Sequence, residues 1–230
     1  MKRVAIVQSS YIPWKGYFDL IAAVDEFVLY DDVQYTRRDW RNRNRIKTPL
    51  GLQWLTVPVR VKGRYHQAIR DTEIDGTAWA TSHLAAMQQN YARAPFYAAV
   101  SGEIAPAYRA PPARLSELNR VLIETVCRYL GIATPIRASD ELALAGDRSQ
   151  RLANLCAALG AGEYVSGPSA KAYLDEAEFT RRGMTVRWFD YDGYPEYPQL
   201  WGPFEHRVTI LDLLFNCGPD APRYMRHVRA

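Results

Sequence analysis

Residues 4–35, VAIVQSSYIPWKGYFDLIAAVDEFVLYDDVQY, decide the fold of this chain. Residues 4–7 form a short run rich in β-branched side chains, which is typical of a strand. Residues 17–26 then space their apolar side chains as a helix does, and residues 27–35 predict a second strand. A strand, a helix and a strand in this order predict two parallel strands joined by a right-handed crossover.

The rest of the chain continues this alternation of strands and helices. Residues 52–59, LQWLTVPV, predict a third strand of the same sheet, and residues 147–162 predict a helix that ends at glycine. A strand, a tight turn and a helix start follow at 163–174. We therefore predict an α/β protein with a mostly parallel sheet and a nucleotide-binding-like β-α-β start. It is expected to be a single domain over 1–230 with a helical insertion at about 77–130.

Composition narrows the class of protein. The chain has 230 residues and a formal net charge of +4, with a pI near 8.9, which permits a nucleotide or nucleic-acid partner without demanding one. No run approaches the ~20 apolar residues of a membrane helix, and the N-terminus MKRVAIVQSS has no signal-peptide core. We therefore expect a cytoplasmic protein without a membrane span. The three cysteines lie far apart, which argues against a disulfide framework.

The loop after the first strand is the first candidate site, because ligands of parallel sheets gather at the carboxyl ends of the strands. This strand leads into QSSYIPWKG. Gln8, Tyr11 and Trp14 are its candidate substrate-binding residues, and the alternative for Trp14 is a packed corner of the fold.

The second strand leads into a denser polar stretch, DDVQYTRRDWRNRNR at 31–45. Guanidinium groups suit carboxylate or phosphate, and an indole can stack on a base or a sugar. The candidate substrate-binding residues here are Gln34, Arg38, Trp40, Asn42, Arg43, Asn44 and Arg45. The alternative is a solvated arginine-rich loop.

Asp31 and Asp32 are the candidate catalytic carboxylates. Since side chains alternate along a strand, we expect one to face the interior and the other to face solvent. A carboxylate at a strand end can deprotonate an amine or hold Mg²⁺, and the alternative is an ion pair with a nearby arginine. His83 is the best acid-base histidine, although a lone helical histidine is commonly structural. The histidine spacing predicts no metal site.

The segment YVSGPSAKAY offers a third wall for the same site. Ser166, Gly167, Ser169 and Lys171 lie between a predicted strand and a predicted helix. Hydroxyls, a lysine and the free amides of a helix start can hold an anion. In the alternative interpretation, Ser169 only caps the helix.

Five segments of the chain resemble, in order, the signature segments of the WbqC-like protein family. They are QSSYIPWKGYFD, FVLYDDVQYTRRDWRNRNRIKT, WLTVPV, YVSGPSAKAYLDE and ILDLLFNCGP. Family members often have proline at the position of Ser9, where this sequence departs. The family is found among bacterial O-antigen and other surface-polysaccharide genes and has been proposed to transfer glycine onto a sugar. The resemblance therefore implies a transferase in surface-polysaccharide or related small-molecule biosynthesis, moving glycine or another activated aminoacyl group to an amino-sugar.

Such a reaction needs an activated carboxyl group. The sequence names no cofactor, and ATP or a charged tRNA would supply the activated donor. The expected partners are a small-molecule or nucleotide-linked anionic substrate and tRNA. The competing interpretation is a non-catalytic protein that binds a nucleotide-sugar or RNA. Asp31 and Asp32 in a closed pocket with Gln8 and Arg38 would favour an enzyme, whereas an open stripe of arginines would favour binding.

Overall fold

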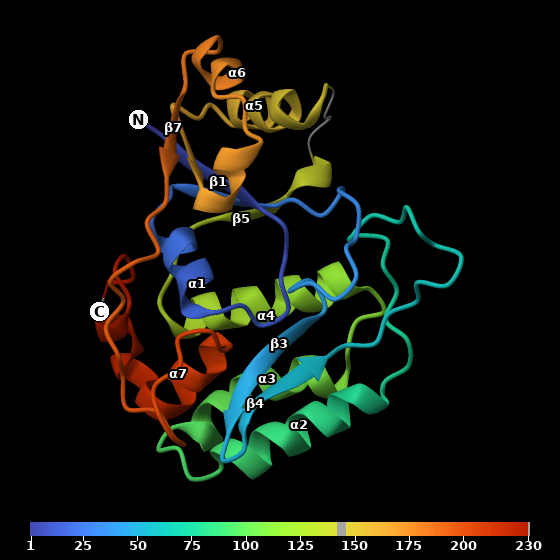
Figure 1. The fold of residues 1–230 in the computed structure, drawn as a ribbon, viewed down its shortest axis with the longest axis vertical. Helices are drawn as coiled ribbons and strands as arrows, with labels where there is room; N and C mark the ends of the chain where they lie inside the picture. Colours follow the sequence, from blue (N-terminus) through green and yellow to red (C-terminus); the bar gives the residue numbers. More distant parts are fainter. Residues whose placement is uncertain (142–145, 230) are drawn as a thin grey trace.

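The computed structural model describes residues 1–141 and 146–229 and contains a five-stranded parallel sheet, which lies in the upper half of the view in Figure 1. Its strands are β1 (Arg3–Val7), β2 (Glu26–Leu29), β5 (Ile136–Ala138), β6 (Glu163–Ser166) and β7 (Thr185–Trp188). They lie in the order β5-β2-β1-β6-β7, and every neighbouring pair is parallel. The predicted α/β class with a mostly parallel sheet is confirmed.

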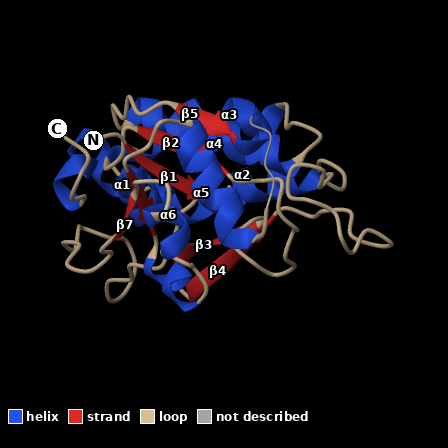
Figure 2. Ribbon diagram, turned by 90° about the horizontal axis from the view of Figure 1, so that it is seen from above, coloured by secondary structure: helices blue, strands red, loops and turns tan. Residues whose placement is uncertain are grey.

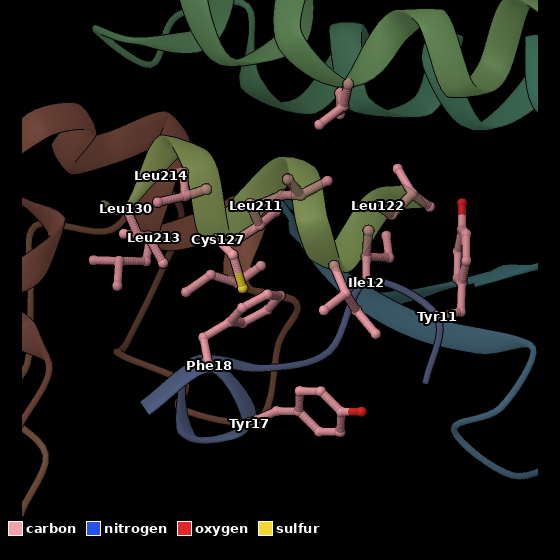
Figure 3. Close-up of a cluster of buried hydrophobic side chains, with 14 of the residues drawn as sticks. Tyr11, Ile12, Tyr17, Phe18, Leu122, Cys127, Leu130, Leu211, Leu213 and Leu214 are labelled. Carbon is pink, nitrogen blue, oxygen red and sulfur yellow. The ribbon is translucent and has the colours of Figure 1, made fainter. Parts of the chain in front are cut away.

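Side chains of β1 alternate between two apolar cores, one on each face of the sheet. Ala5 belongs to the core that includes Phe18, whereas Val4 and Ile6 belong to the core that includes Leu152. The first core is covered by α1 (Lys15–Ala22), α4 (Leu115–Tyr129) and α7 (Ile210–Cys217), whose side chains meet in Figure 3. The second core is covered by α5 (Arg148–Ala158) and α6 (Ala177–Thr180). The sheet is therefore covered by helices on both faces, as buried parallel sheets are.

The order of the strands creates a topological switch point between β1 and β6. From β1 the chain moves outward through β2 to β5, then returns through α5 to β6 on the other side of β1 and continues to β7. The connections that follow β1 and β6 therefore run toward opposite edges of the sheet, although the two strands themselves are parallel. In sheets of this kind, a crevice forms outside the carboxyl ends of these two strands.

Residues 43–56 form a separate antiparallel hairpin, β3 (Arg43–Thr48) and β4 (Gly51–Thr56). The prediction of a third strand in the main sheet is wrong, because β4 pairs with the preceding arginine-rich segment across a short turn. The buried side chains of Ile46 and Leu55 seat the hairpin on the core shared with α2 (Ala78–Tyr91) and α3 (Tyr97–Arg109). Figure 2 shows the hairpin along one side of the molecule, apart from the parallel strands.

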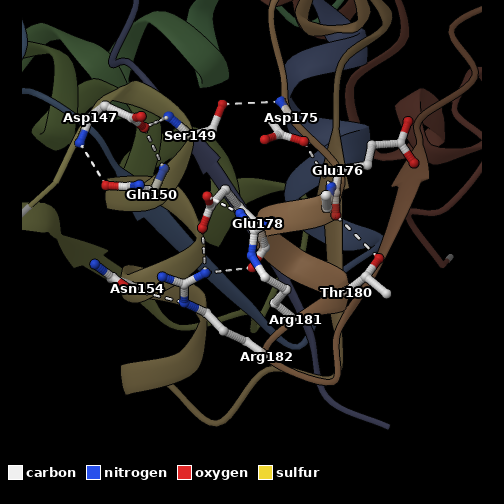
Figure 4. Close-up of polar contacts among 11 residues, drawn as sticks. Asp147, Ser149, Gln150, Asn154, Asp175, Glu176, Glu178, Thr180, Arg181 and Arg182 are labelled. Carbon is white, nitrogen blue, oxygen red and sulfur yellow. Dashed lines mark hydrogen bonds and ion pairs between the residues drawn. The ribbon is translucent and has the colours of Figure 1, made fainter.

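The start of α5 is anchored by polar contacts that Figure 4 shows. Asp147 accepts the N–H groups of Ser149 and Gln150, and the Gln150 side chain accepts the Asp147 N–H, which completes a capping box. Ser149 Oγ also accepts the N–H of Asp175, 3.1 Å away, from the segment before α6. These contacts fix the first turn of α5, which carries two arginines toward the switch point.

Three short 3₁₀ helices complete the fold: η1 (Ser139–Glu141), η2 (Pro168–Ala172) and η3 (Gly218–Tyr224). All three cysteines are buried and unpaired. Within residues 1–141 and 146–229, no helix is both long enough and apolar enough to span a bilayer.

Candidate active site at the switch point

A crevice of about 690 Å³ lies at the carboxyl ends of β1 and β6. We call it the switch-point crevice. Its volume falls in the range of ~300–1,000 Å³ that is typical of small-molecule sites. The residues that line it and carry polar groups are Gln8, Tyr30, Gln34, Thr36, Arg41, Asp147, Arg148, Arg151, Tyr164, Ser166, Ser169, Tyr173 and Tyr191, with the backbone of Gly167 among them. The structure therefore brings Gln8, Gln34, Ser166, Gly167 and Ser169 together from the three segments in which the sequence placed them.

Arg41 brings a mostly buried guanidinium group to the crevice. Its side chain is 12% exposed, Nη1 donates to the Ser9 carbonyl oxygen at 3.1 Å, and Asp39 Oδ2 lies 3.8 Å from Nε. Nε itself is buried and has no hydrogen-bond partner in the described part of the chain. Buried donors are nearly always paired, so this one has the capacity to bind a ligand oxygen.

Arg151 and Arg148 are crevice residues that the sequence analysis missed. Arg151 Nη2 lies 3.4 Å from Asp32 Oδ2, and its buried Nε has no partner among the described residues. Arg148 lies over the ring of Tyr173, with Cζ 3.6 Å from the ring centroid. The signal was present in the sequence, because two arginines three residues apart at a helix start share one face of the helix.

The turn after β6 contributes less positive charge than predicted. It is followed by the five-residue η2, and Gly167 occupies its cap position without a side-chain hydrogen bond. Ser169 lies inside η2, so the alternative in which it caps a helix is wrong. Pro168 has no N–H to offer an anion. Lys171 Nζ lies 5.6 Å from the ring centroid of Trp188 and is not among the residues that line the crevice.

Asp31 and Asp32 line a second cavity of about 180 Å³ near the carboxyl ends of β2 and β5. Gln8 and Arg38 line two other cavities, so the single closed pocket of these four residues that would favour an enzyme does not form. Asp31 is buried, its Oδ1 accepts the Ser9 N–H at 2.8 Å, and burial raises its pKa. The Asp32 side chain is only 11% exposed because Ser139 and Arg151 both bond to it. The expectation that one of the pair faces solvent is therefore wrong. Asp32 instead forms an ion pair with Arg151, which was its alternative role. Since Asp32 lines this cavity and Arg151 lines the crevice, the ion pair connects the two.

Ser9 holds Asp31 and Arg41 in place. Its N–H donates to Asp31, its carbonyl oxygen accepts from Arg41, and its Oγ accepts from Asn119 Nδ2 at 3.0 Å. A proline at this position would remove the N–H that Asp31 accepts. Ser9 therefore supplies a hydrogen bond to the candidate catalytic carboxylate that a proline could not.

Two predicted site residues, Tyr11 and His83, lie in the core. The Tyr11 hydroxyl bonds to His83 Nδ1 at 2.8 Å and to the Tyr108 hydroxyl at 2.7 Å. Burial lowers the pKa of His83 to about 4, so the imidazole is neutral at neutral pH. Neither residue lines the crevice. Trp14 also lies outside it, although its ring packs on Tyr191, a crevice residue, at 5.4 Å between centroids.

The polar residues of β3 and of the segment just before it divide between two faces. The Asn42 side chain donates to the Val57 carbonyl oxygen at 2.8 Å, and Asn44 donates to that of Ile12 at 2.7 Å, so both amides support the fold. The other face carries Arg43 and Arg45, which lie with Arg38 and Trp40 at a cavity that shares no lining residue with the crevice. This cavity, of about 250 Å³, is lined by Arg38, Trp40, Arg43, Arg45 and Trp54. We call these five residues the arginine–tryptophan surface.

The fold and the site define a doubly wound α/β protein with an arginine-lined crevice at its switch point. The chain belongs to the WbqC-like protein family, whose model matches residues 8–224. It is 59% identical over 230 residues to a Mycobacterium tuberculosis (strain ATCC 25618 / H37Rv) protein named "Uncharacterized protein Rv1507c", with 100% of each chain covered. No solved structure was found to match the chain.

Proposed function

We propose that the protein is a group transferase that binds a nucleotide-linked anionic substrate in the switch-point crevice. The observation that carries the proposal is the pair of buried guanidinium Nε atoms, on Arg41 and Arg151, that have no hydrogen-bond partner in the described residues. Both belong to a crevice at the position where doubly wound folds bind nucleotides. Two planar donors at one site suit the oxygens of a phosphate or diphosphate group.

The adjoining cavity supports an acceptor with an amino group. Four carboxylates line it, on Asp31, Asp32, Glu117 and Asp140, together with three arginines, Arg70, Arg114 and Arg120. An amino group would bind at the buried Asp31, since a carboxylate close by favours an ammonium group. Asp31 is the proposed general base, because burial raises its pKa toward that of a useful proton acceptor. Asp32 is the proposed positioning residue, since it bonds to Arg151 across the boundary between the two cavities.

In the proposed reaction, the amine nitrogen of an amino-sugar attacks the carbonyl carbon of an activated aminoacyl group, with glycine as the first choice. The new C–N bond forms, the bond from the carbonyl carbon to the leaving oxygen breaks, and Asp31 takes the proton that the amine loses. The leaving oxygen belongs to a phosphate in an adenylate or to the terminal ribose of a charged tRNA. The family assignment supports this choice of donor and acceptor through the surface-polysaccharide role that the resemblance to the family implies.

The binding step is tested by calorimetry with ATP and a panel of nucleotide-sugars, including amino-sugar nucleotides. We expect at least one to bind the full chain, and we expect Arg151→Ala to weaken it by about tenfold or more, the scale of a charge-assisted hydrogen bond. The matched control is Arg223→Ala, which removes an exposed arginine on η3. No binding by any nucleotide, or equal losses for both variants, would refute the crevice as the site.

A further inference from the structure

The arginine–tryptophan surface has no role in the reaction proposed above, and its composition is unusual for an exposed patch. Trp40 and Trp54 are 41% and 43% exposed, although large aromatic side chains seldom remain so open to solvent. Their ring centroids lie 5.4 Å apart. The cavity over them is lined by arginine and tryptophan alone, without a carboxylate.

The three arginines of the surface are not neutralised by any carboxylate in the described part of the chain. Among residues 1–141 and 146–229, none of Arg38, Arg43 and Arg45 forms an ion pair with a carboxylate. The Nε atoms of Arg43 and Arg45 are also buried without a hydrogen-bond partner in that part of the chain. A ligand that presents several anionic oxygens would satisfy them.

The guanidinium groups lie against the indoles. Arg43 Cζ is 4.2 Å from the Trp54 ring centroid, and Arg45 Cζ is 5.3 Å from Trp54 and 5.5 Å from Trp40. The pairing of Arg45 with Trp54 across β3 and β4 fixes this arrangement in the backbone register. Arg38 closes the group through its left-handed backbone conformation (φ 57°), and its carbonyl oxygen accepts from Arg43 Nη2. This backbone conformation is energetically unfavourable for a non-glycine residue, and the surrounding contacts hold Arg38 in it.

We propose that the arginine–tryptophan surface binds a single-stranded polynucleotide. Bases stack on the exposed indoles while backbone phosphates bind the arginines, which is the combination that single-strand-binding proteins use. A single strand carries alternating bases and phosphates, which match the neighbouring indoles and guanidinium groups of the surface. An acidic protein segment would match the charge but would have no flat ring for the tryptophans.

The surface adjoins the switch-point crevice along the chain. Arg41 lines the crevice and Arg43 lines the surface, and two residues span at most ~7 Å of backbone. A strand bound at the surface therefore has one end close to the crevice. The binding proposal rests on the surface alone and stands whether or not the crevice carries out group transfer.

The proposal is tested by fluorescence anisotropy with the full chain and fluorescein-labelled 12-mers of U and of dT. We expect both to bind at about 50 mM salt. Trp54→Ala should weaken binding by about fivefold to 100-fold, the range for loss of one base–aromatic stack, and Trp54→Phe by less. Arg45→Gln should lower the slope of log Kd against log salt by about 0.7, the share of one phosphate contact. The relative affinities for the U and dT strands then identify the natural sugar.

The controls separate this site from non-specific charge and from the crevice. Arg223→Gln removes the same charge at an exposed position on η3 and should leave binding unchanged. Arg151→Ala should spare the 12-mers, because Arg151 lies in the crevice. The proposal is overturned by no binding of either strand, by wild-type affinity in both Trp54→Phe and Arg45→Gln, or by equal affinity for a duplex or for poly-glutamate.

Discussion

The switch-point crevice and the arginine–tryptophan surface hold their arginines in different ways, although both draw on residues 31–45. In the crevice, Arg41 is 12% exposed and donates to a backbone carbonyl, and Arg151 bonds to Asp32. On the surface, Arg43 and Arg45 lie over exposed indoles, without a carboxylate partner in the described chain. A guanidinium group fixed by buried acceptors is oriented before its ligand arrives, which suits a small molecule. Arginines stacked on open rings suit a flexible polymer.

The largest effect that tests this division is on turnover. Asp31→Asn keeps the shape of the carboxylate but removes the base, and general-base catalysis typically contributes 10²–10⁴-fold to a rate. We expect turnover of a nucleotide-linked substrate to fall by about 100-fold or more. Arg45→Gln, on the surface, should keep the wild-type rate with the same small-molecule substrate. The measurement is product formation by mass spectrometry.

The matched control for this charge change is Asp220→Asn, at an exposed position on η3. Calorimetric binding to each variant shows whether the substrate still binds, since a base is needed for turnover and not for affinity. If Asp31→Asn turned over substrate at more than half the wild-type rate, Asp31 would not be the base.

The sequence predicted the strand-end parts of the crevice because these follow from topology alone. Gln8 and Ser166 follow neighbouring parallel strands, and the carboxyl ends of such strands meet at one edge of the sheet. Arg148 and Arg151 were missed because their approach depends on the crossover through α5, which places them opposite Arg41. The spacing of the two arginines shows that they share one face of the helix, but it does not show which part of the molecule that face meets.

The division of the arginine-rich stretch was also beyond the sequence analysis. Arg38, Arg43 and Arg45 were predicted to lie in one cleft with Arg41. Residues 52–59 were assigned to the main sheet, but β4 pairs with β3, and the resulting hairpin places these arginines at a different cavity from Arg41. His83 was chosen for its residue type. Its core role depends on Tyr11, 72 residues away, which only the tertiary structure reveals.

A second prediction concerns the support that both regions share. Tyr11, bonded to His83, donates its N–H to the Trp40 carbonyl oxygen, and its own carbonyl oxygen lies 3.2 Å from Asn44 Nδ2. The pKa of His83 is about 4 in the folded protein and about 6.5 in an unfolded chain. Between these values the unfolded state binds the extra proton, so stability is full above pH 6.5 and falls as the pH drops toward 4. The loss due to His83 is about 3 kcal/mol.

Urea unfolding at pH 7 and at pH 4.5 measures this effect. His83→Gln should unfold with a smaller acid-induced loss than the wild type, although it will be less stable at pH 7. Asp31 acts in the opposite direction, because a raised carboxyl pKa makes stability increase as the pH falls. Asp31 is present in both wild type and His83→Gln, so the difference between their acid-induced losses isolates the histidine. Equal acid sensitivity in wild type and His83→Gln would contradict the prediction.

A third prediction tests the two regions against each other by affinity. Arg41→Ala removes a buried donor of the crevice, and a charge-assisted hydrogen bond is worth about 1.5–3 kcal/mol. We therefore expect nucleotide affinity to fall about tenfold to 100-fold, with little change in binding of a single strand. Trp54→Ala should give the reverse pattern. Calorimetry with a nucleotide and anisotropy with a 12-mer measure both, and parallel losses in both assays would mean that the regions form one site.

The smallest effect is expected for Arg148, which is exposed and stacks on Tyr173. Because water screens an exposed guanidinium group, its contribution should be well below that of buried Arg41. An exposed charge contact is worth about 0.2–1 kcal/mol, so Arg148→Ala should weaken nucleotide binding by at most about fivefold. Tyr173→Leu should weaken it similarly, and Tyr173→Phe, which keeps the ring, should not.

Calorimetry of the double variant Arg148→Ala/Tyr173→Leu completes the cycle. If the ring acts by holding the guanidinium group, the double variant should be no weaker than Arg148→Ala alone, because Tyr173 then has nothing left to orient. If Arg148→Ala lowered nucleotide affinity as much as Arg41→Ala does, burial would not determine how much each crevice arginine contributes to binding. In that case the contrast with the open arginine–tryptophan surface would have to rest on the stacked indoles alone, and not on how deeply each guanidinium group is held.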